Sequence, residues 1–280
     1  MDLVVFRHLW GVDTPLRDVL PTFPALGYHG LEAPLPDATS ARDFHALRRE
    51  HGLEFIPLIF TSGPRDGARS VDAHLESFTR ELDEALRHDP ALVNVHAGAD
   101  SWSEREAEAF FQGALDVARG APVPVAFETH RGRALFTPWG TRRLVETFPE
   151  LRLTADFSHW VCVCERLLDD QDDTLRRVAE QVVHVHARVG FEQGPQVSDP
   201  RAPEFDAHLT AHERWWSLVW EAQRARGLAR SFLTPEFGPP AYQPVLPYTL
   251  MPVAPLAEIC DWMARRQTAR FAQSGRTPAP

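Results

Sequence analysis

Residues 182–188 read Val182-Val183-His184-Val185-His186-Ala187-Arg188, an apolar run that carries two histidines and ends in an arginine. Because side chains alternate between the two faces of a strand, His184, His186 and Arg188 share one face. Similar apolar runs recur along the chain with longer amphipathic stretches between them, which is typical of parallel β/α units. The eight runs are Leu3–Phe6, Gly30–Ala33, Leu53–Phe60, Ala91–Val95, Val123–Phe127, Leu151–Ala155, Val182–Val185 and Ser231–Thr234.

The amphipathic stretches predict helices. Ser103 and Glu106 have the spacing of a capping box, and Gly227 stands where a helix that ends at Arg226 would place its terminal glycine. The predicted helices are Val71–Arg87, Ser103–Arg119, Arg142–Thr147, Ala207–Arg226 and Pro255–Arg270.

Eight β/α units in 280 residues predict the α/β class and a (β/α)8 TIM barrel. We expect one domain over residues 1–270 and a flexible tail over residues 271–280. The competing architecture, a doubly wound open sheet, normally has a glycine-rich phosphate-binding turn after its first strand. No such turn follows Phe6, so the sequence gives no sign of a nucleotide cofactor.

The composition excludes several classes of function. The formal net charge is −10, which argues against a nucleic-acid binder. All 29 basic residues are arginines, so neither a Schiff-base lysine, as pyridoxal phosphate requires, nor a phosphate-loop lysine is present. Catalysis here must depend on carboxylates, histidines, arginines or a metal ion.

The same sequence indicates a cytoplasmic protein. No apolar run approaches the about 18–20 residues that a bilayer span needs, and residues 1–7 do not read as a signal peptide. Three cysteines, an odd number, disfavour a disulfide framework and favour a reducing compartment. We expect no membrane partner and no nucleic-acid partner.

Polar residues end the apolar runs, where a barrel of this kind has its active site. Four consecutive runs deliver Glu128, Asp156, His186 and Glu236. Three carboxylates and one imidazole suit a divalent ion such as Mn, Mg, Co, Fe or Zn. The alternative is a buried hydrogen-bonded network without metal.

These segments resemble the sugar phosphate isomerase/epimerase superfamily, whose members have the xylose-isomerase-like TIM barrel. The resemblance covers nearly the whole chain and rests on residues 128–133, 156–160 and 184–190, which match one branch of the superfamily. It implies a single divalent metal ion with Glu128, Asp156, His186 and Glu236 as ligands. It also implies an isomerase or epimerase of a small sugar, sugar acid or sugar phosphate, in which Glu128 and Glu236 move a proton through an enediolate.

Further residues are candidates for substrate contact. Arg131 and Arg188 would clamp a carboxylate or phosphate, which favours an anionic carbohydrate. His159 stands where similar enzymes contact a substrate oxygen, and His8, His96 and His130 either line the pocket or pack. A partner on the other ring nitrogen should orient His186. Glu32 is either a pocket residue or the partner of an arginine, and His184 is more typical of a core histidine.

The resemblance has limits. Ketohexose epimerases of the superfamily carry a second glutamate where this chain has Ala134, which disfavours a free ketohexose. Aldose isomerases that shift a hydride need a lysine, and this chain has none, so a hydride-shift isomerase is disfavoured. A lyase or dehydratase on the same site is the first alternative, and a metal-dependent phosphodiesterase or a non-catalytic binding barrel is less favoured. The Pro235–Pro252 stretch, which carries Tyr242, predicts an ordered active-site loop. A homo-oligomer is compatible with the sequence: Trp215-Trp216 either pack or form a contact between subunits, and the Pro235–Pro252 loop is a second candidate contact.

Overall fold

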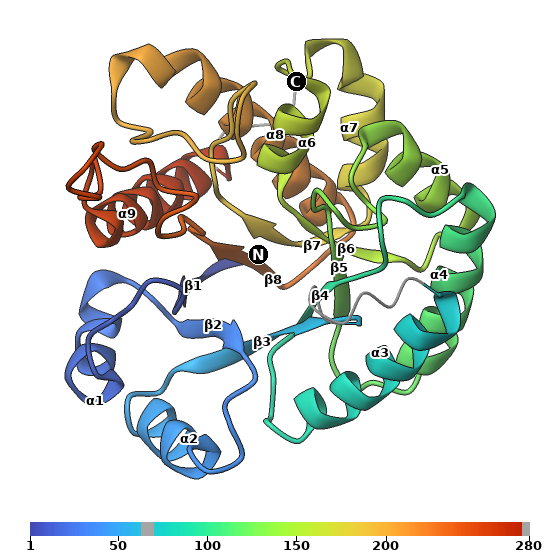
Figure 1. The fold of residues 1–280 in the computed structure, drawn as a ribbon, viewed down its shortest axis with the longest axis horizontal. Coiled ribbons are helices and arrows are strands. Elements are labelled where there is room, and N and C mark those ends of the chain that lie inside the picture. The colour runs from blue at the N-terminus through green and yellow to red at the C-terminus, as the bar shows by residue number, and fades with distance from the viewer. Residues whose placement is uncertain (63–69, 276–280) are drawn as a thin grey trace.

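The computed structural model describes residues 1–62 and 70–275. In this part of the chain eight parallel strands close into a barrel in the order β1 to β8, with β8 paired to β1, so the predicted TIM barrel is confirmed. Figure 1 shows the strands at the centre and the helices around them. The strands are β1 (Asp2–His8), β2 (Gly30–Pro34), β3 (Glu54–Phe60), β4 (Val93–His96), β5 (Val125–Glu128), β6 (Arg152–Ala155), β7 (Val182–His186) and β8 (Arg230–Thr234).

The helices follow the strands and cover the outside of the barrel (Figure 1). They are α1 (Leu16–Val19), α2 (Ala41–Glu50), α3 (Val71–Leu86), α4 (Glu104–Ala118), α5 (Pro138–Thr147), α6 (Phe157–Cys164), α7 (Asp172–Ala179), α8 (Asp206–Ala225) and α9 (Leu256–Ser274). Short 3-10 turns lie at η1 (Leu20–Thr22), η2 (Pro24–Leu26), η3 (Asp169–Gln171) and η4 (Pro203–Phe205). None of the helices in the described ranges has both the length and the apolar composition that a bilayer crossing requires.

The helix ends explain where the predictions hold and where they fail. Ser103 and Glu106 form the predicted capping box at the start of α4. The start of α5 is wrong by four residues, because Thr137 caps the helix and Pro138 occupies its first turn. Helix α9 continues to Ser274, past the predicted boundary at residue 270. Residues 276–280 of the predicted tail lie outside the described residues.

Two apolar clusters hold the barrel, and strand alternation separates them. Val5 and Phe127 belong to the large cluster between the strands and the helices, whereas Val4, Phe6 and Ala126 belong to a smaller one on the opposite strand face, inside the barrel. The inward side chains that follow are polar: Glu32, Asn94 and His184 are all fully buried. The barrel interior therefore changes from apolar to polar toward the carboxyl ends of the strands.

Candidate metal centre

The structure brings the four predicted ligands together. Glu128 ends β5, His186 ends β7, and Glu236 follows β8 by two residues. Asp156 follows β6 and caps α6, since its carboxylate accepts the backbone N–H of Ser158 at 3.0 Å. One ligand atom from each residue lies within 4.8 Å of the others, and all four residues are buried.

The free atoms in this cluster fit a divalent ion. Glu128 Oε1, His186 Nδ1 and Glu236 Oε2 are buried, and none has a hydrogen-bond partner among the described residues. His186 Nδ1 lies 2.8 Å from Glu236 Oε2 without hydrogen-bond geometry, so both atoms face the same space in the cluster. Buried polar atoms of this kind are costly unless something binds them. Three carboxylates and an imidazole match the ligand preferences of Mn, Mg, Co, Fe and Zn.

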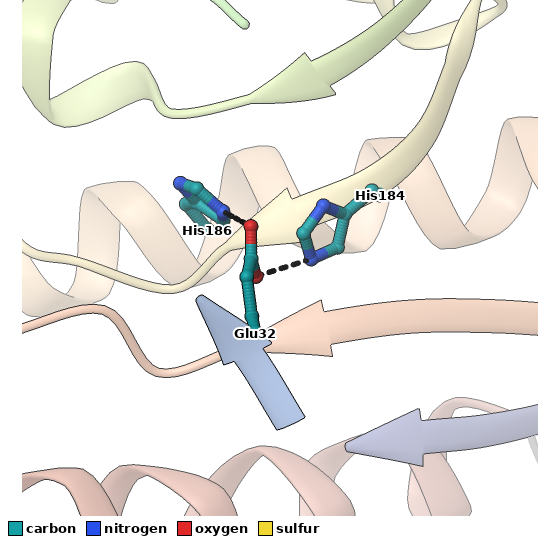
Figure 2. Close-up of side chains that lie close together, drawn as sticks. All are labelled: Glu32, His184 and His186. Atoms are coloured by element: carbon teal, nitrogen blue, oxygen red, sulfur yellow. Dashed lines mark hydrogen bonds and ion pairs between the residues drawn. The ribbon is translucent and has the colours of Figure 1, made fainter. Parts of the chain in front are cut away.

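Glu32 on β2 orients His186 from behind. Figure 2 shows its carboxylate between His186 and His184, with Oε1 at 2.9 Å from His186 Nε2 and Oε2 at 3.4 Å from His184 Nε2. A hydrogen bond from the Nε2–H of His186 to Glu32 holds the ring so that Nδ1 faces the ligand cluster, where an ion would bind that nitrogen once it has released its proton. Asn94 also donates to Glu32, at 3.0 Å. Sequence reasoning expected such a partner without naming it; an acid inside an otherwise apolar run was the available signal.

His184 lies deeper in the barrel. Its Nε2 lies 2.9 Å from the Thr234 hydroxyl and its Nδ1 lies 3.3 Å from the Thr154 hydroxyl. Burial lowers its pKa to about 4. His184 is therefore a core histidine with hydrogen-bond partners.

The electrostatics of the cluster are those of closely packed acids and bases. Burial would raise the pKa of Glu128, but His96 and His186 lower it well below its ordinary value. Burial also opposes ionisation of Glu236, and there Arg188 and His186 outweigh it and lower the pKa. Burial raises the pKa of Asp156 to about 6 in spite of Arg188. Burial would lower the pKa of His186, but Glu236, Glu32 and Glu128 raise it well above its ordinary value.

Arg188 lines the pocket but is also engaged by acids of the cluster. It is 1 % exposed, its Nη2 forms an ion pair with Asp156 and lies 3.1 Å from Glu236 Oε2, and its Nη1 has no hydrogen-bond partner among the described residues, so the predicted clamp with Arg131 stays a prediction. Two candidate metal ligands therefore hold its charge. Sequence spacing placed Arg188 on the correct strand face, but a face does not specify which neighbour the side chain will meet.

Some of the predicted histidines contact the candidate ligands, and others pack against neighbouring histidine rings. His8 lies 3.4 Å from Glu236 through Nε2, and its Nδ1 accepts the backbone N–H of Trp10. His96 lies 2.7 Å from Glu128. The His130 ring packs between His96 and His159, with centroid separations of 4.4 and 3.8 Å.

His159 differs from the prediction of a substrate contact. It is fully buried, and its Nε2 lies 2.9 Å from Arg188 Nη2. Burial lowers the pKa of His159 well below its ordinary value and that of His130 to about 3. His159 packs behind Arg188, whereas His8, His96 and His130 line the pocket.

A pocket of about 760 Å³ opens onto this centre. Besides the predicted His8, His96, His130, Arg131, Arg188 and Glu236, its walls include Trp10, Leu58, Phe60, Arg133 and Tyr242. Sequence reasoning assigned no individual role to these five, although it expected the loop that carries Tyr242 at the active site. Trp10 follows β1 by two residues, so its position also carried a usable signal.

The candidate oligomer contacts separate into two cases. Trp215 and Trp216 are fully buried, so of the two predicted roles the structure supports packing in the core and not a contact surface. The proline-rich loop contributes Glu236 and Tyr242 to the pocket, while its apolar residues Tyr248 and Leu250 are exposed. A contact through this loop remains a prediction.

The family model of the xylose isomerase-like TIM barrel matches residues 24–209, well over half of the chain. The chain belongs to this family. No curated protein sequence matches it significantly. Among solved structures, it resembles a xylose isomerase-like TIM barrel protein from Mycobacterium smegmatis in complex with magnesium, with a TM-score of 0.65, 12% identity and coverage of 97% of both chains.

Two further solved structures show the same fold. An AP endonuclease, family 2, from Brucella melitensis has a TM-score of 0.62 and 16% identity over 94% of this chain and 98% of that one. A 3-keto-D-glucoside 4-epimerase from E. coli has a TM-score of 0.60 and 13% identity over 98% of this chain and 99% of that one. At such identities these likenesses establish the architecture, and the residues of the site must carry any argument about the reaction.

Proposed function

We propose that this protein is a divalent-metal-dependent isomerase or epimerase of a small sugar, sugar acid or sugar phosphate. The observation that carries the proposal is the convergence of Glu128, Asp156, His186 and Glu236 within 4.8 Å, from four consecutive strand ends. A bound divalent ion would supply Lewis-acid polarisation of a substrate carbonyl. Manganese is the first ion to test.

The two glutamates would move the proton. Glu128 and Glu236 come from β5 and β8, and each has one oxygen with no hydrogen-bond partner among the described residues. The other oxygens are positioned: Asn94 donates to Glu128 Oε2 at 2.8 Å, and His8 lies 3.4 Å from Glu236 Oε1. One carboxylate, in its ionised form, would remove the proton next to the carbonyl, and the other, carrying a proton taken from solvent, would deliver it to a neighbouring carbon or to the opposite face. Neighbouring basic groups lower the pKa values of both glutamates, which favours the ionised form that the proton-accepting one needs.

The proposal extends to the setting of the protein. All three cysteines are free thiols, which suits the reducing cytoplasm. The family's epimerase neighbour supports a place in carbohydrate metabolism, with a small carbohydrate as the partner. The net charge of −10 continues to disfavour a nucleic-acid substrate.

The test is incubation of the metal-loaded protein with ketoses, aldoses, sugar acids and sugar phosphates in deuterated water, read by NMR and mass spectrometry. An isomerase or epimerase incorporates solvent deuterium into a product with the substrate's formula. Loss of one water would identify a dehydratase, and three tightly bound ions per chain would favour a phosphodiesterase. Exchange without any change of substrate identity would also be informative, since it isolates the proton-removal step.

Two variants assign the proton transfer. Glu128→Gln and Glu236→Gln should each reduce turnover by about 100-fold or more, while the matched control Glu146→Gln, on the surface of α5, should not. Glu146 is 46% exposed and pairs with Arg142. Full activity in Glu236→Gln would support a barrel in which this acid has no chemical role and would overturn the mechanism.

A further inference from the structure

Two arginines of the pocket have no acidic partner. Arg131 and Arg133 lie in the loop between β5 and α5, and both line the pocket. Within residues 1–62 and 70–275, neither has a carboxylate within 4.0 Å, whereas Arg188 on the same pocket contacts two. A cation that lacks a counter-ion inside a pocket is costly unless a ligand compensates it.

Arg133 is held rigidly. It is only 8 % exposed, and its Nη1 donates to the backbone carbonyls of Thr61 at 3.2 Å and Gly98 at 3.4 Å. Its guanidinium carbon lies 5.9 Å from the Phe60 ring centroid. These contacts use one nitrogen of the fork, and no other Arg133 nitrogen is buried without a partner. The remaining donors are thus reachable by solvent or a ligand, on a residue that lines the pocket.

The charge of Arg133 is poorly compensated. Burial lowers its pKa, and the two acids that oppose this effect, Glu128 and Asp100, act from beyond ion-pair distance. Glu128 is in addition bound by His96 and Asn94. A guanidinium remains charged in proteins, so Arg133 presents a fixed positive charge to whatever occupies the pocket.

Arg131 completes the arrangement from the pocket mouth. Its guanidinium carbon lies 5.2 Å from the Tyr242 ring centroid. Gly132, between the two arginines, adopts a φ of +75°, a conformation that side chains other than glycine rarely adopt. With this turn between them, both arginines line the pocket, Arg131 beside Tyr242 and Arg133 beside Phe60.

The metal centre needs at most one of these charges. Its three candidate carboxylate ligands and Glu32 carry four negative charges, of which Arg188 and a divalent ion would balance three. Arg131 and Arg133 supply two positive charges against the one that remains, although the chain as a whole has a net charge of −10. The walls beside Arg133 include Leu58 and Phe60, and apolar surroundings strengthen a contact between a guanidinium and an oxyanion.

We infer that Arg133, assisted by Arg131, forms an oxyanion subsite that holds a carboxylate or phosphate group of the substrate. This inference rests on the proposed function, because it assigns the remote end of the molecule whose carbonyl end reacts at the metal centre. It narrows the substrate to an anionic hydroxy-carbonyl compound. In this subsite Arg133, in place of the predicted Arg188, holds the anionic group together with Arg131.

The experiment measures binding without turnover. Calorimetry compares quinate with methyl quinate, and glucose 6-phosphate with glucose, first with a chelator and then with Mg²⁺. Each pair differs in the presence of an anionic group, so the pair that shows a preference identifies carboxylate or phosphate as the recognised group. The variants are Arg133→Gln, Arg133→Lys and Arg131→Gln, with Arg142→Gln on the surface of α5 as the matched control.

The wild-type protein should bind the anionic member of at least one pair more tightly than its neutral counterpart. Arg133→Gln should lower the affinity for that anion about 10- to 100-fold and leave the affinity for the neutral member unchanged, as expected for loss of charge-assisted hydrogen bonds. Arg133→Lys should keep part of the preference, because it retains the charge but not the fork. Arg131→Gln should have a smaller effect, and Arg142→Gln none.

Two results would overturn the subsite: equal affinity for both members of each pair, or an unchanged preference in Arg133→Gln. If Arg133→Gln does not fold, two other measurements test the subsite. One is the anion affinity of the exposed variant Arg131→Gln, and the other is whether the wild-type protein loses its anion preference at high salt. A preserved anion preference in a protein that turns over no sugar would sink the proposed function and leave the subsite intact. Turnover of neutral sugars without any anion preference would do the reverse.

Discussion

Glu32 is the residue on which the geometry of His186 depends. We expect Glu32→Gln to lower the affinity for a divalent ion about 10- to 100-fold, because an amide no longer enforces the tautomer that frees Nδ1. Competition with a metal-binding dye gives the affinity directly. Glu54→Gln is the matched control, since Glu54 pairs with Arg230 at the surface. Equal metal affinity in Glu32→Gln and wild type would show that Glu32 has only a packing role.

His212 on α8 makes stability depend on acid. Its Nε2 accepts the backbone N–H of Gly190 at 3.2 Å, and its Nδ1 donates to the His208 carbonyl. Burial lowers its pKa to about 3 from an ordinary 6.5, so the unfolded chain binds a proton that the folded chain does not. The stabilisation is complete above pH 6.5 and is lost as the pH falls toward 3.

Between pH 7 and pH 5, His212 alone should remove about 2 kcal/mol from the free energy of unfolding. Urea titrations of His212→Gln should show a pH dependence reduced by that amount, although the variant is less stable at pH 7 because it loses both hydrogen bonds. Above pH 7 the two proteins should show the same slope. An undiminished acid dependence in His212→Gln would contradict this assignment.

Residue-level predictions succeeded where the position of a residue along a strand determines what surrounds its side chain. Each candidate metal ligand ends or closely follows a strand, so period and topology alone were enough to place all four together. Arg188 and His159 were assigned to the substrate, and the structure adds contacts that were not predicted, since it packs them against one another and pairs Arg188 with Asp156. Their partners depend on side-chain directions that no sequence spacing specifies.

The predictions of the secondary-structure elements likewise succeeded for the strands and failed for helix α6. The strands were predicted within about two residues at each end, because buried parallel strands are continuous apolar runs. The helix α6 was missed: its sequence, Phe157-Ser158-His159-Trp160-Val161-Cys162-Val163-Cys164, lacks an amphipathic period, since five of its residues are buried. Arg133 was missed because its position depends on the turn at Gly132.

The capping box of α4 gives a test at this scale. Ser103 accepts the backbone N–H of Glu106, and Glu106 accepts that of Ser103. Ser103→Ala should lower the free energy of unfolding by about 1 kcal/mol. Ser40, at the N-terminus of α2, makes no side-chain cap hydrogen bond, so Ser40→Ala is the control and should cost less. Thermal and urea unfolding of both variants measure the difference, and equal losses would argue against the cap.

For the whole molecule, metal removal should be visible as a loss of stability. Three buried acids in one cluster repel one another, and an ion that binds only the folded chain stabilises it by mass action. Addition of Mn²⁺ at 100 times its Kd to chelator-treated protein should add about 2.7 kcal/mol. Glu236→Gln should lose most of this increment. Identical melting temperatures with chelator and with Mn²⁺ would contradict a tight metal site.

The pairing of β8 with β1 joins the last and first strands of the barrel, and Glu236 lies just beyond that seam. During synthesis Glu128, Asp156 and His186 emerge first, on a sheet that has no closing strand. The fourth ligand reaches its place only when the barrel shuts. A nascent chain on the ribosome should therefore bind divalent ions only weakly. The complete site should form in the last step of folding.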